Sequence, residues 1–258
     1  MNGNVVRPFR ADLHIHTVLS PCGELEMGAP DIVARALEER LDVIAITDHN
    51  AADNCPAVIG AASGTPLVVL PGMEVQTAED IHIVCLFETC ERAFDMQRTL
   101  WLRMPGVRNR PSVFGEQIVV DAENNIVREE EILLVQGVGY SVDEVADLAH
   151  RIGGIAFLAH VDRPSFAYPA VLGPLPAEFP SDAVEFSRCL GADDATRLRG
   201  EYPHRTILRS SDAHRLGDIS FSYGTTLMLR SACFQELRLA LSGSEGRAVL
   251  WPFGDEAR

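Results

Sequence analysis

Short, almost wholly apolar runs alternate along the chain with stretches in which apolar residues recur at helical spacing. The clearest run, Val-Ile-Ala-Ile-Thr at 43–47, is typical of a strand buried on both faces, as in parallel sheets. Similar runs predict further strands over 11–16, 67–75, 81–87, 155–159, 183–186 and 206–211. Most of these runs lead directly into polar residues.

The stretches between the strands predict amphipathic helices. One begins at Pro30-Asp31, because proline is tolerated in the first turn of a helix. Another begins at Ser141, which is followed three residues later by Glu144 as in a capping box, and ends before Gly154. Further helices are predicted over 52–62 and 231–241. This alternation indicates an α/β fold with a mostly parallel sheet, and about seven strands favour a closed barrel over an open sheet.

Two stretches depart from the alternation. The turn at 77–80 is too short for a parallel crossover, so the strands on either side of it are predicted to be antiparallel neighbours. That pairing places His82, at the start of one strand, beside Glu74, near the end of the other. Residues 89–131 interrupt the barrel pattern and are interpreted as an insertion that contains a hairpin, with strands over 117–120 and 126–127.

Composition and charge narrow the classes of protein that fit. The 258 residues suit a single domain, 1–258 with a core of about 10–230, and the 47% hydrophobic content excludes a mostly disordered chain. No apolar run is long enough to span a membrane or direct export, so a cytoplasmic protein is expected. With 22 basic and 37 acidic residues the formal charge is −15, which disfavours long nucleic acid but not a small phosphorylated substrate. Nothing here predicts the oligomeric state.

Residue types that bind metals gather at the ends of the predicted strands. In a barrel of this kind the carboxyl ends of the strands meet at one face. The residues expected there are His14, His16, His49, Glu74, His82, His160, Asp212 and His214. So many ligands suit two or three ions rather than one, with Glu74 as the natural bridge. A site rich in imidazole fits zinc, iron or manganese better than calcium or magnesium.

These residues resemble the motifs of the PHP (polymerase and histidinol phosphatase) family. The motifs that carry the resemblance are Asp12-Leu13-His14-Ile15-His16, Asp48-His49, Glu74, His82, His160 and Asp212-Ala213-His214. The resemblance runs from about Arg10 to Gly217. It implies a distorted seven-stranded, TIM-like β/α barrel with a trinuclear metal site and phosphoesterase activity. It also implies that these histidines, with Glu74 and Asp212, are the metal ligands.

One position departs from the family pattern. Many members have a histidine six residues after the His-x-His pair, and this chain has Cys22 there. A thiolate ligand would favour zinc or iron over manganese. The alternative is a small loop residue that follows Pro21 and binds no metal.

The expected reaction is hydrolysis of a small phosphorylated metabolite or nucleotide by a metal-activated hydroxide. Arg163 and Arg215 are candidates for holding the phosphoryl oxygens, although surface ion pairs would explain them equally well. Asp48 is a candidate for orienting His49 or protonating the leaving oxygen, with a strand-end cap as the alternative. A catalytically silent regulatory or scaffolding domain that binds metal is the alternative function. An amide hydrolase of the amidohydrolase type is disfavoured, because such barrels normally need a bridging lysine and this chain has no lysine.

Overall fold

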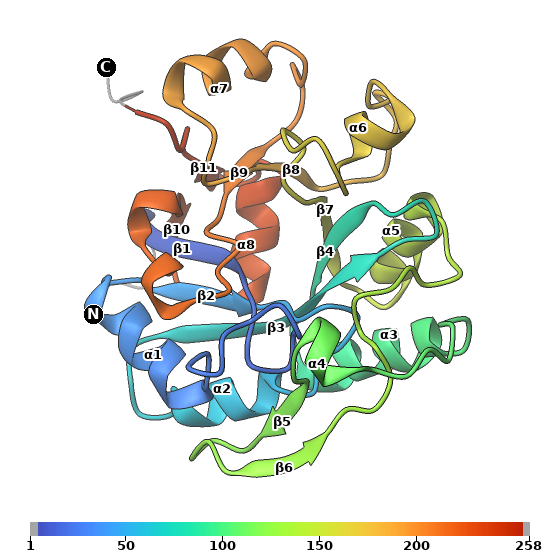
Figure 1. The fold of residues 1–258 in the computed structure, drawn as a ribbon. Coiled ribbons are helices and arrows are strands. Elements are labelled where there is room, and N and C mark those ends of the chain that lie inside the picture. The colour runs from blue at the N-terminus through green and yellow to red at the C-terminus, as the bar shows by residue number, and fades with distance from the viewer. Residues whose placement is uncertain (1–4, 255–258) are drawn as a thin grey trace.

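The computed structural model describes residues 5–254, and its main element is a strongly curved sheet (Figure 1). The strands follow the order β11-β10-β1-β2-β3-β4-β7-β8-β9. Their bounds are β1 Arg7–Ile15, β2 Val43–Ile46, β3 Val68–Gln76, β4 His82–Leu86, β7 Ile155–Leu158, β8 Ala183–Phe186, β9 Ile207–Arg209, β10 Thr225–Leu229 and β11 Ala248–Val249. The α/β class predicted from the sequence is therefore confirmed.

Seven of these strands form a nearly closed barrel. The segment that follows β9 reaches the far end of β1 through a bridge between Ile15 and Ala213, where the backbone N–H of His16 donates to the Ala213 carbonyl at 3.0 Å. The first half of β1 pairs instead with β10, antiparallel, from Arg7 to Ala11. The strands β10 and β11 extend the sheet beyond the seven predicted strands. They escaped prediction because buried and partly buried positions alternate along β10, unlike the fully buried runs of the other strands, and β11 has only two residues.

Strand direction changes where the short turn predicted it. The strands β1, β2 and β3 are parallel, β4 is antiparallel to both β3 and β7, and β7, β8 and β9 are again parallel. In the β3–β4 hairpin Gln76 lies opposite His82 and Glu74 opposite Val84. The hairpin therefore brings the start of β4 to the same end of the barrel as the carboxyl end of β3.

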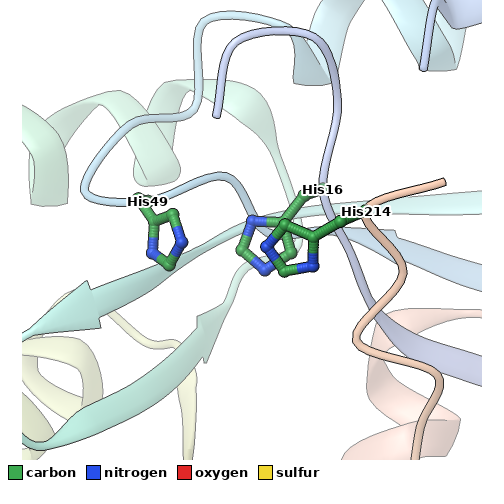
Figure 2. A group of neighbouring side chains, drawn as sticks. All are labelled: His16, His49 and His214. Atoms are coloured by element: carbon green, nitrogen blue, oxygen red, sulfur yellow. The ribbon is translucent and has the colours of Figure 1, made fainter. Parts of the chain in front are cut away.

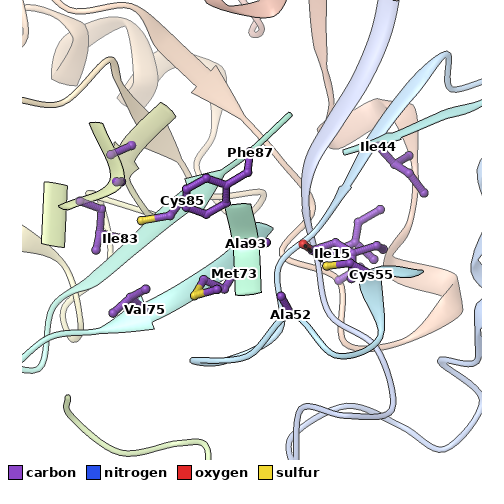
Figure 3. Packing of buried hydrophobic residues seen from close by; sticks show 14 of the residues in the cluster. Ile15, Ile44, Ala52, Cys55, Met73, Val75, Ile83, Cys85, Phe87 and Ala93 are labelled. Atoms are coloured by element: carbon purple, nitrogen blue, oxygen red, sulfur yellow. Dashed lines mark hydrogen bonds between the residues drawn. The ribbon is translucent and has the colours of Figure 1, made fainter. Parts of the chain in front are cut away.

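Helices cover the outer face of the sheet. The helices α1 (Ala29–Glu38), α2 (Cys55–Ala61), α3 (Cys90–Trp101) and α5 (Val142–Arg151) pack against outward residues such as Met73, Val75 and Cys85 (Figure 3). No helix was predicted at α3, which begins the segment 89–131. Its residues Ala93, Met96 and Leu100 are fully buried against the sheet, so this part of the segment belongs to the helical layer. The predicted hairpin follows it, as β5 (Ile118–Val120) and β6 (Ile126–Glu129).

The remaining elements are short. They are α4 (Pro111–Phe114), α6 (Tyr168–Leu172) within the proline-rich stretch, α7 (Ala192–Arg199) and α8 (Phe234–Leu241), with 3-10 turns at Leu216–Asp218 and Phe221–Tyr223. Within residues 5–254, no helix combines the length and apolar character needed to cross a membrane.

The inner face of the sheet divides into an apolar part and a polar part. Inward residues such as Leu70 and Val84 pack with Phe234 and Leu237 of α8, which the curved sheet encloses (Figure 1). Further along the same strands the inward positions are Glu74 and His82, both buried. Because side chains alternate between faces along a strand, these polar residues share a face with the apolar core yet lie beyond it. A layer of apolar side chains inside the barrel therefore lies directly beneath the polar cluster.

An ion pair anchors α8 and gives a test of acid stability. Arg247 donates from Nε to Glu236 Oε2 at 2.9 Å, and the Arg230 backbone N–H donates to the same oxygen at 2.7 Å. The hydrogen bond from Arg247 lowers the pKa of Glu236 to about 2. Because this pKa is depressed in the folded state, the pair stabilises the fold above the unfolded value and this stability is lost as pH falls toward 2.

We expect Glu236→Gln to lower the free energy of unfolding by about 1.5–3 kcal/mol at pH 7, the range for hydrogen bonds to charged groups. The difference from the wild type should shrink between about pH 4.5 and 2. Urea denaturation at several pH values measures both effects. Glu245→Gln is the matched control, because Glu245 is 65% exposed and bonds the same arginine. A difference from the wild type that stayed constant down to pH 2 would contradict the prediction.

Candidate metal centre

The carboxylate of Glu74 lies at the centre of a buried cluster of histidines at the end of the barrel. The distances from its oxygens to the nearest ring nitrogens are 2.9 Å for His82, 3.1 Å for His49, 3.2 Å for His160, 3.3 Å for His14 and 3.5 Å for His16. Burial alone would raise the pKa of Glu74, but the charges of His82 and His14 outweigh it and hold the pKa well below its usual range. An ionised carboxylate surrounded by imidazoles is suited to bridging cations.

The two histidines that end β1 converge on one point. Their Nε2 atoms lie 3.2 Å apart, and Asp212 Oδ1 lies 3.2 Å from Nε2 of His16 and 3.5 Å from Nε2 of His14. The pKa of His16 is well below its usual value because of burial and the neighbouring charges of His214 and His49. An imidazole that is neutral at its inward nitrogen is in the form that binds metal.

Several buried polar atoms of the cluster make no hydrogen bond of good geometry among the described residues, although His49 Nδ1, His82 Nδ1 and Asp212 Oδ1 lie in close ion-pair contact with their neighbours. They include His49 Nδ1, His160 Nδ1, Asp212 Oδ1 and both ring nitrogens of His82. A buried polar atom without a partner is costly, and a bound cation would satisfy those that face the centre of the cluster. Among residues 5–254, three groups of side chains have potential metal-binding atoms within 4.8 Å of one another. They are His16-His49-His214, His14-His16-Glu74 and His49-Glu74-His82. Figure 2 shows the first of these groups. The donors therefore fit divalent transition metal ions.

The outer ring nitrogens of three histidines in the cluster are held by neighbouring oxygens. His14 Nδ1 contacts Glu185 Oε1 at 3.0 Å, His16 Nδ1 contacts Ser20 Oγ at 3.0 Å, and His214 Nδ1 contacts the carbonyl of Asp212 at 3.0 Å. Such contacts fix the tautomer and orientation of a metal-binding imidazole, and here they leave Nε2 free to face the site.

Glu185 is a functional residue that the sequence analysis missed. It is fully buried on β8, and its Oε1 also accepts the backbone N–H of His160 at 3.3 Å. It therefore connects two of the histidines around Glu74. A signal was present in the sequence, since Glu185 is the one charged residue in the short apolar run 183–186.

Asp48 holds the loop that follows β1. Its Oδ1 accepts the Ser20 hydroxyl and the Thr17 backbone N–H, and its Oδ2 accepts the Thr17 hydroxyl, all at 2.7 Å. Ser20 Oγ in turn accepts the His49 backbone N–H at 3.2 Å. Asp48 is thus linked to His16 and His49 through Ser20.

Three residues that follow strands at the site have positive φ angles, in the left-handed region. The φ angles are 30° at His160, 47° at Asp212 and 52° at Asn50. Such angles cost free energy in residues other than glycine and persist where the surrounding structure enforces them, often at functional sites. The backbone that directs His160 and Asp212 into the cluster is therefore strained.

The remaining predicted residues lie around the cluster at different depths. Cys22 is an exposed residue of the loop after β1, but its thiol contacts His49 and His214. Desolvation by neighbouring groups acts to raise the pKa of the thiol, but the charges and hydrogen bonds of the two histidines outweigh it and lower the pKa to about 6. Arg163 Nη2 contacts Asp212 Oδ2 at 2.7 Å, on the oxygen opposite the one that faces His16. Arg215 is 67% exposed and pairs with Glu24 at 2.9 Å, which favours the surface ion pair as its explanation.

Comparison with known proteins shows the family of the chain. The model of the PHP domain family matches residues 12–174, more than half of the chain. The chain therefore belongs to the PHP domain family. No curated protein matches it.

Solved structures resemble the chain in fold at low sequence identity. A lesion-specific endonuclease from Pyrococcus furiosus is 16% identical with a TM-score of 0.67, and the match covers 94% of this chain and 58% of the endonuclease. A two-domain protein from Bacteroides vulgatus, described as containing a predicted PHP-like metal-dependent phosphoesterase, is 14% identical with a TM-score of 0.53, covering 97% and 66%. A protein from Chromobacterium violaceum described as an amidohydrolase, with bound sulfate, is 18% identical with a TM-score of 0.54, covering 96% and 99%.

Proposed function

We propose that the protein is a metal-dependent phosphoesterase that hydrolyses a small phosphorylated metabolite or nucleotide. The observation that carries the proposal is the buried Glu74 carboxylate with five imidazoles within 3.5 Å of its oxygens, several of whose polar atoms have no other partner. Two or three divalent ions of zinc, iron or manganese, when bound there, would polarise a phosphate ester and lower the pKa of water. Glu74 would bridge them, and Glu185 and Ser20 would keep the imidazoles oriented.

Cys22 is proposed as a further ligand beside His49 and His214. The support is the contact of its thiol with His49 and His214, whose hydrogen bonds and charges also lower the pKa of the thiol to about 6, which favours the thiolate at neutral pH. We expect the protein loaded with cobalt(II) to show thiolate-to-cobalt charge-transfer absorption, and Cys22→Ser to lose it while retaining the bands of histidine-bound cobalt. Cys189→Ser, which alters another exposed cysteine, is the control. An identical spectrum in Cys22→Ser and the wild type would exclude the thiolate ligand.

Arg163 is proposed to hold the phosphoryl group as charge builds up. Its guanidinium is already fixed by Asp212 and remains 34% exposed beside the cluster. We expect Arg163→Gln to lower kcat about 10²–10³-fold, the usual cost of removing one donor to a developing negative charge. Arg215→Gln should change kcat less than about threefold. Steady-state kinetics with metal content measured on each variant tests this, and equal losses in the two variants would contradict the assignment.

The size of the substrate is argued from charge. A formal charge of −15 repels long polyanions, although bound cations reverse the field locally. The endonuclease of similar fold acts on nucleic acid, so an oligonucleotide is the second candidate substrate. An amide substrate is disfavoured by the absence of lysine.

Release of inorganic phosphate from a panel of phosphate monoesters, diesters and short oligonucleotides, with metal analysis of the same preparation, tests the function. We expect turnover of one ester class, its loss after chelation and its return when metal is added. Two or three bound ions without turnover on any ester would instead support the silent regulatory domain.

A further inference from the structure

The loop that follows His160 lies at the edge of the metal centre and is fixed at both ends. The Val161 backbone N–H donates to the Glu185 carbonyl at 2.9 Å, and the His82 backbone N–H donates to the Phe166 carbonyl at 2.8 Å. Between these anchors Arg163 pairs with Asp212. The loop is therefore tied to the barrel next to the clustered residues.

Phe166 has an unusual environment for a large apolar residue. Its ring stacks on the imidazole of His82, with centroids 4.6 Å apart and planes inclined by 23°, yet the residue is 41% exposed. Its φ is 57°, a left-handed angle that is rare and strained for a bulky side chain. An exposed aromatic ring is thus held against a histidine of the Glu74 cluster by a strained backbone.

Covering His82 does not require an aromatic ring, because any apolar side chain of similar size would exclude water. The phenyl ring adds a flat surface on which a planar group can stack. Aromatic side chains stack nucleobases in this way with little dependence on which base it is. Arg163, on the same loop, offers a cation for the phosphate. An apolar plane and a cation beside one metal centre match a molecule in which a flat ring is attached to a phosphate ester.

We infer that Phe166 is a specificity residue that stacks the base of a nucleoside phosphate while its ester lies at the metal centre. The inference rests on the proposed function and selects nucleotides from its range of substrates. A free mononucleotide and the end of a DNA or RNA strand present the same chemistry, and the acidic surface favours the mononucleotide.

The test compares Phe166→Ala, Phe166→Leu and Phe166→Trp with the wild type on nucleoside monophosphates, a short single-stranded oligonucleotide and glycerol phosphate, which has no ring. We expect Phe166→Ala and Phe166→Leu to raise KM for nucleoside monophosphates about 10- to 100-fold, the range for loss of one stacked base. Phe166→Trp should keep KM within a few-fold. The wild type, Phe166→Leu and Phe166→Trp, in all of which His82 remains covered, should hydrolyse glycerol phosphate equally. Metal content should not change.

Equal losses on glycerol phosphate and nucleotides in Phe166→Leu, or a wild-type KM for nucleotides in that variant, would show that Phe166 only covers His82 and would overturn the inference. A KM effect confined to the oligonucleotide would overturn the choice of mononucleotide. Calorimetric binding of a nucleoside monophosphate to the metal-loaded protein separates the two proposals. If the nucleotide binds without turnover and binds more weakly to Phe166→Ala, the phosphoesterase is rejected and the stacking site is retained. If turnover occurs and does not depend on Phe166, the phosphoesterase is retained and the stacking site is rejected.

Discussion

Replacement of Glu74 by glutamine is expected to lower phosphoesterase activity at least about 10³-fold and to reduce the number of bound metal ions. The amide retains the size of the carboxylate but removes the charge that faces five imidazoles, so it cannot balance two cations. Loss of bridged metal removes several kcal/mol of transition-state stabilisation, and each 1.36 kcal/mol is tenfold in rate.

Metal analysis and phosphate release on the same preparation measure both effects. Glu129→Gln, on the exposed strand β6, is the matched control and should behave as the wild type. A Glu74→Gln protein with unchanged metal content and turnover would refute the bridging role.

Truncation of Glu185 is expected to have the second largest effect. Glu185→Ala removes the oxygen that contacts His14 Nδ1 at 3.0 Å and the acceptor of the His160 backbone N–H. Loss of such an orienting partner typically costs about 10- to 100-fold in metal affinity or activity. Glu185→Gln keeps an acceptor oxygen and should lose less.

Competition of each variant with a chelating indicator measures the metal affinity, and kcat at saturating metal shows whether activity recovers. Exposed Glu201 supplies the control, as Glu201→Ala. The role assigned to Glu185 fails if Glu185→Ala binds metal as tightly as the wild type and keeps its activity.

Local patterns determined much of the fold and most of the cluster. Side-chain alternation and apolar runs predicted the buried strands, and the short turn at 77–80 predicted the hairpin that carries His82 to Glu74. These features could be predicted because strand periodicity and turn length are properties of neighbouring residues. The histidines were recognisable because they end apolar runs, where a barrel collects its functional residues.

Other features depended on partners distant in sequence. The sequence pattern indicated no strand at β10, because buried and partly buried positions alternate along its five residues and the strand gains its place by pairing with β1 across more than two hundred residues. It also failed to indicate α3, whose arginines and acidic residues concealed the stripe of Ala93, Met96 and Leu100.

By itself the sequence determined which residue types end the strands and that they are suited to binding metal. Only the tertiary structure decided how they are aimed. It placed Glu185 against His14 across 171 residues, made Ser20 the link from Asp48 to His16, put Arg163 on Asp212 and laid Phe166 over His82. The physical reason is that a ligand's identity is a property of one residue, whereas its tautomer, orientation and charge are set by groups that closure of the barrel brings together.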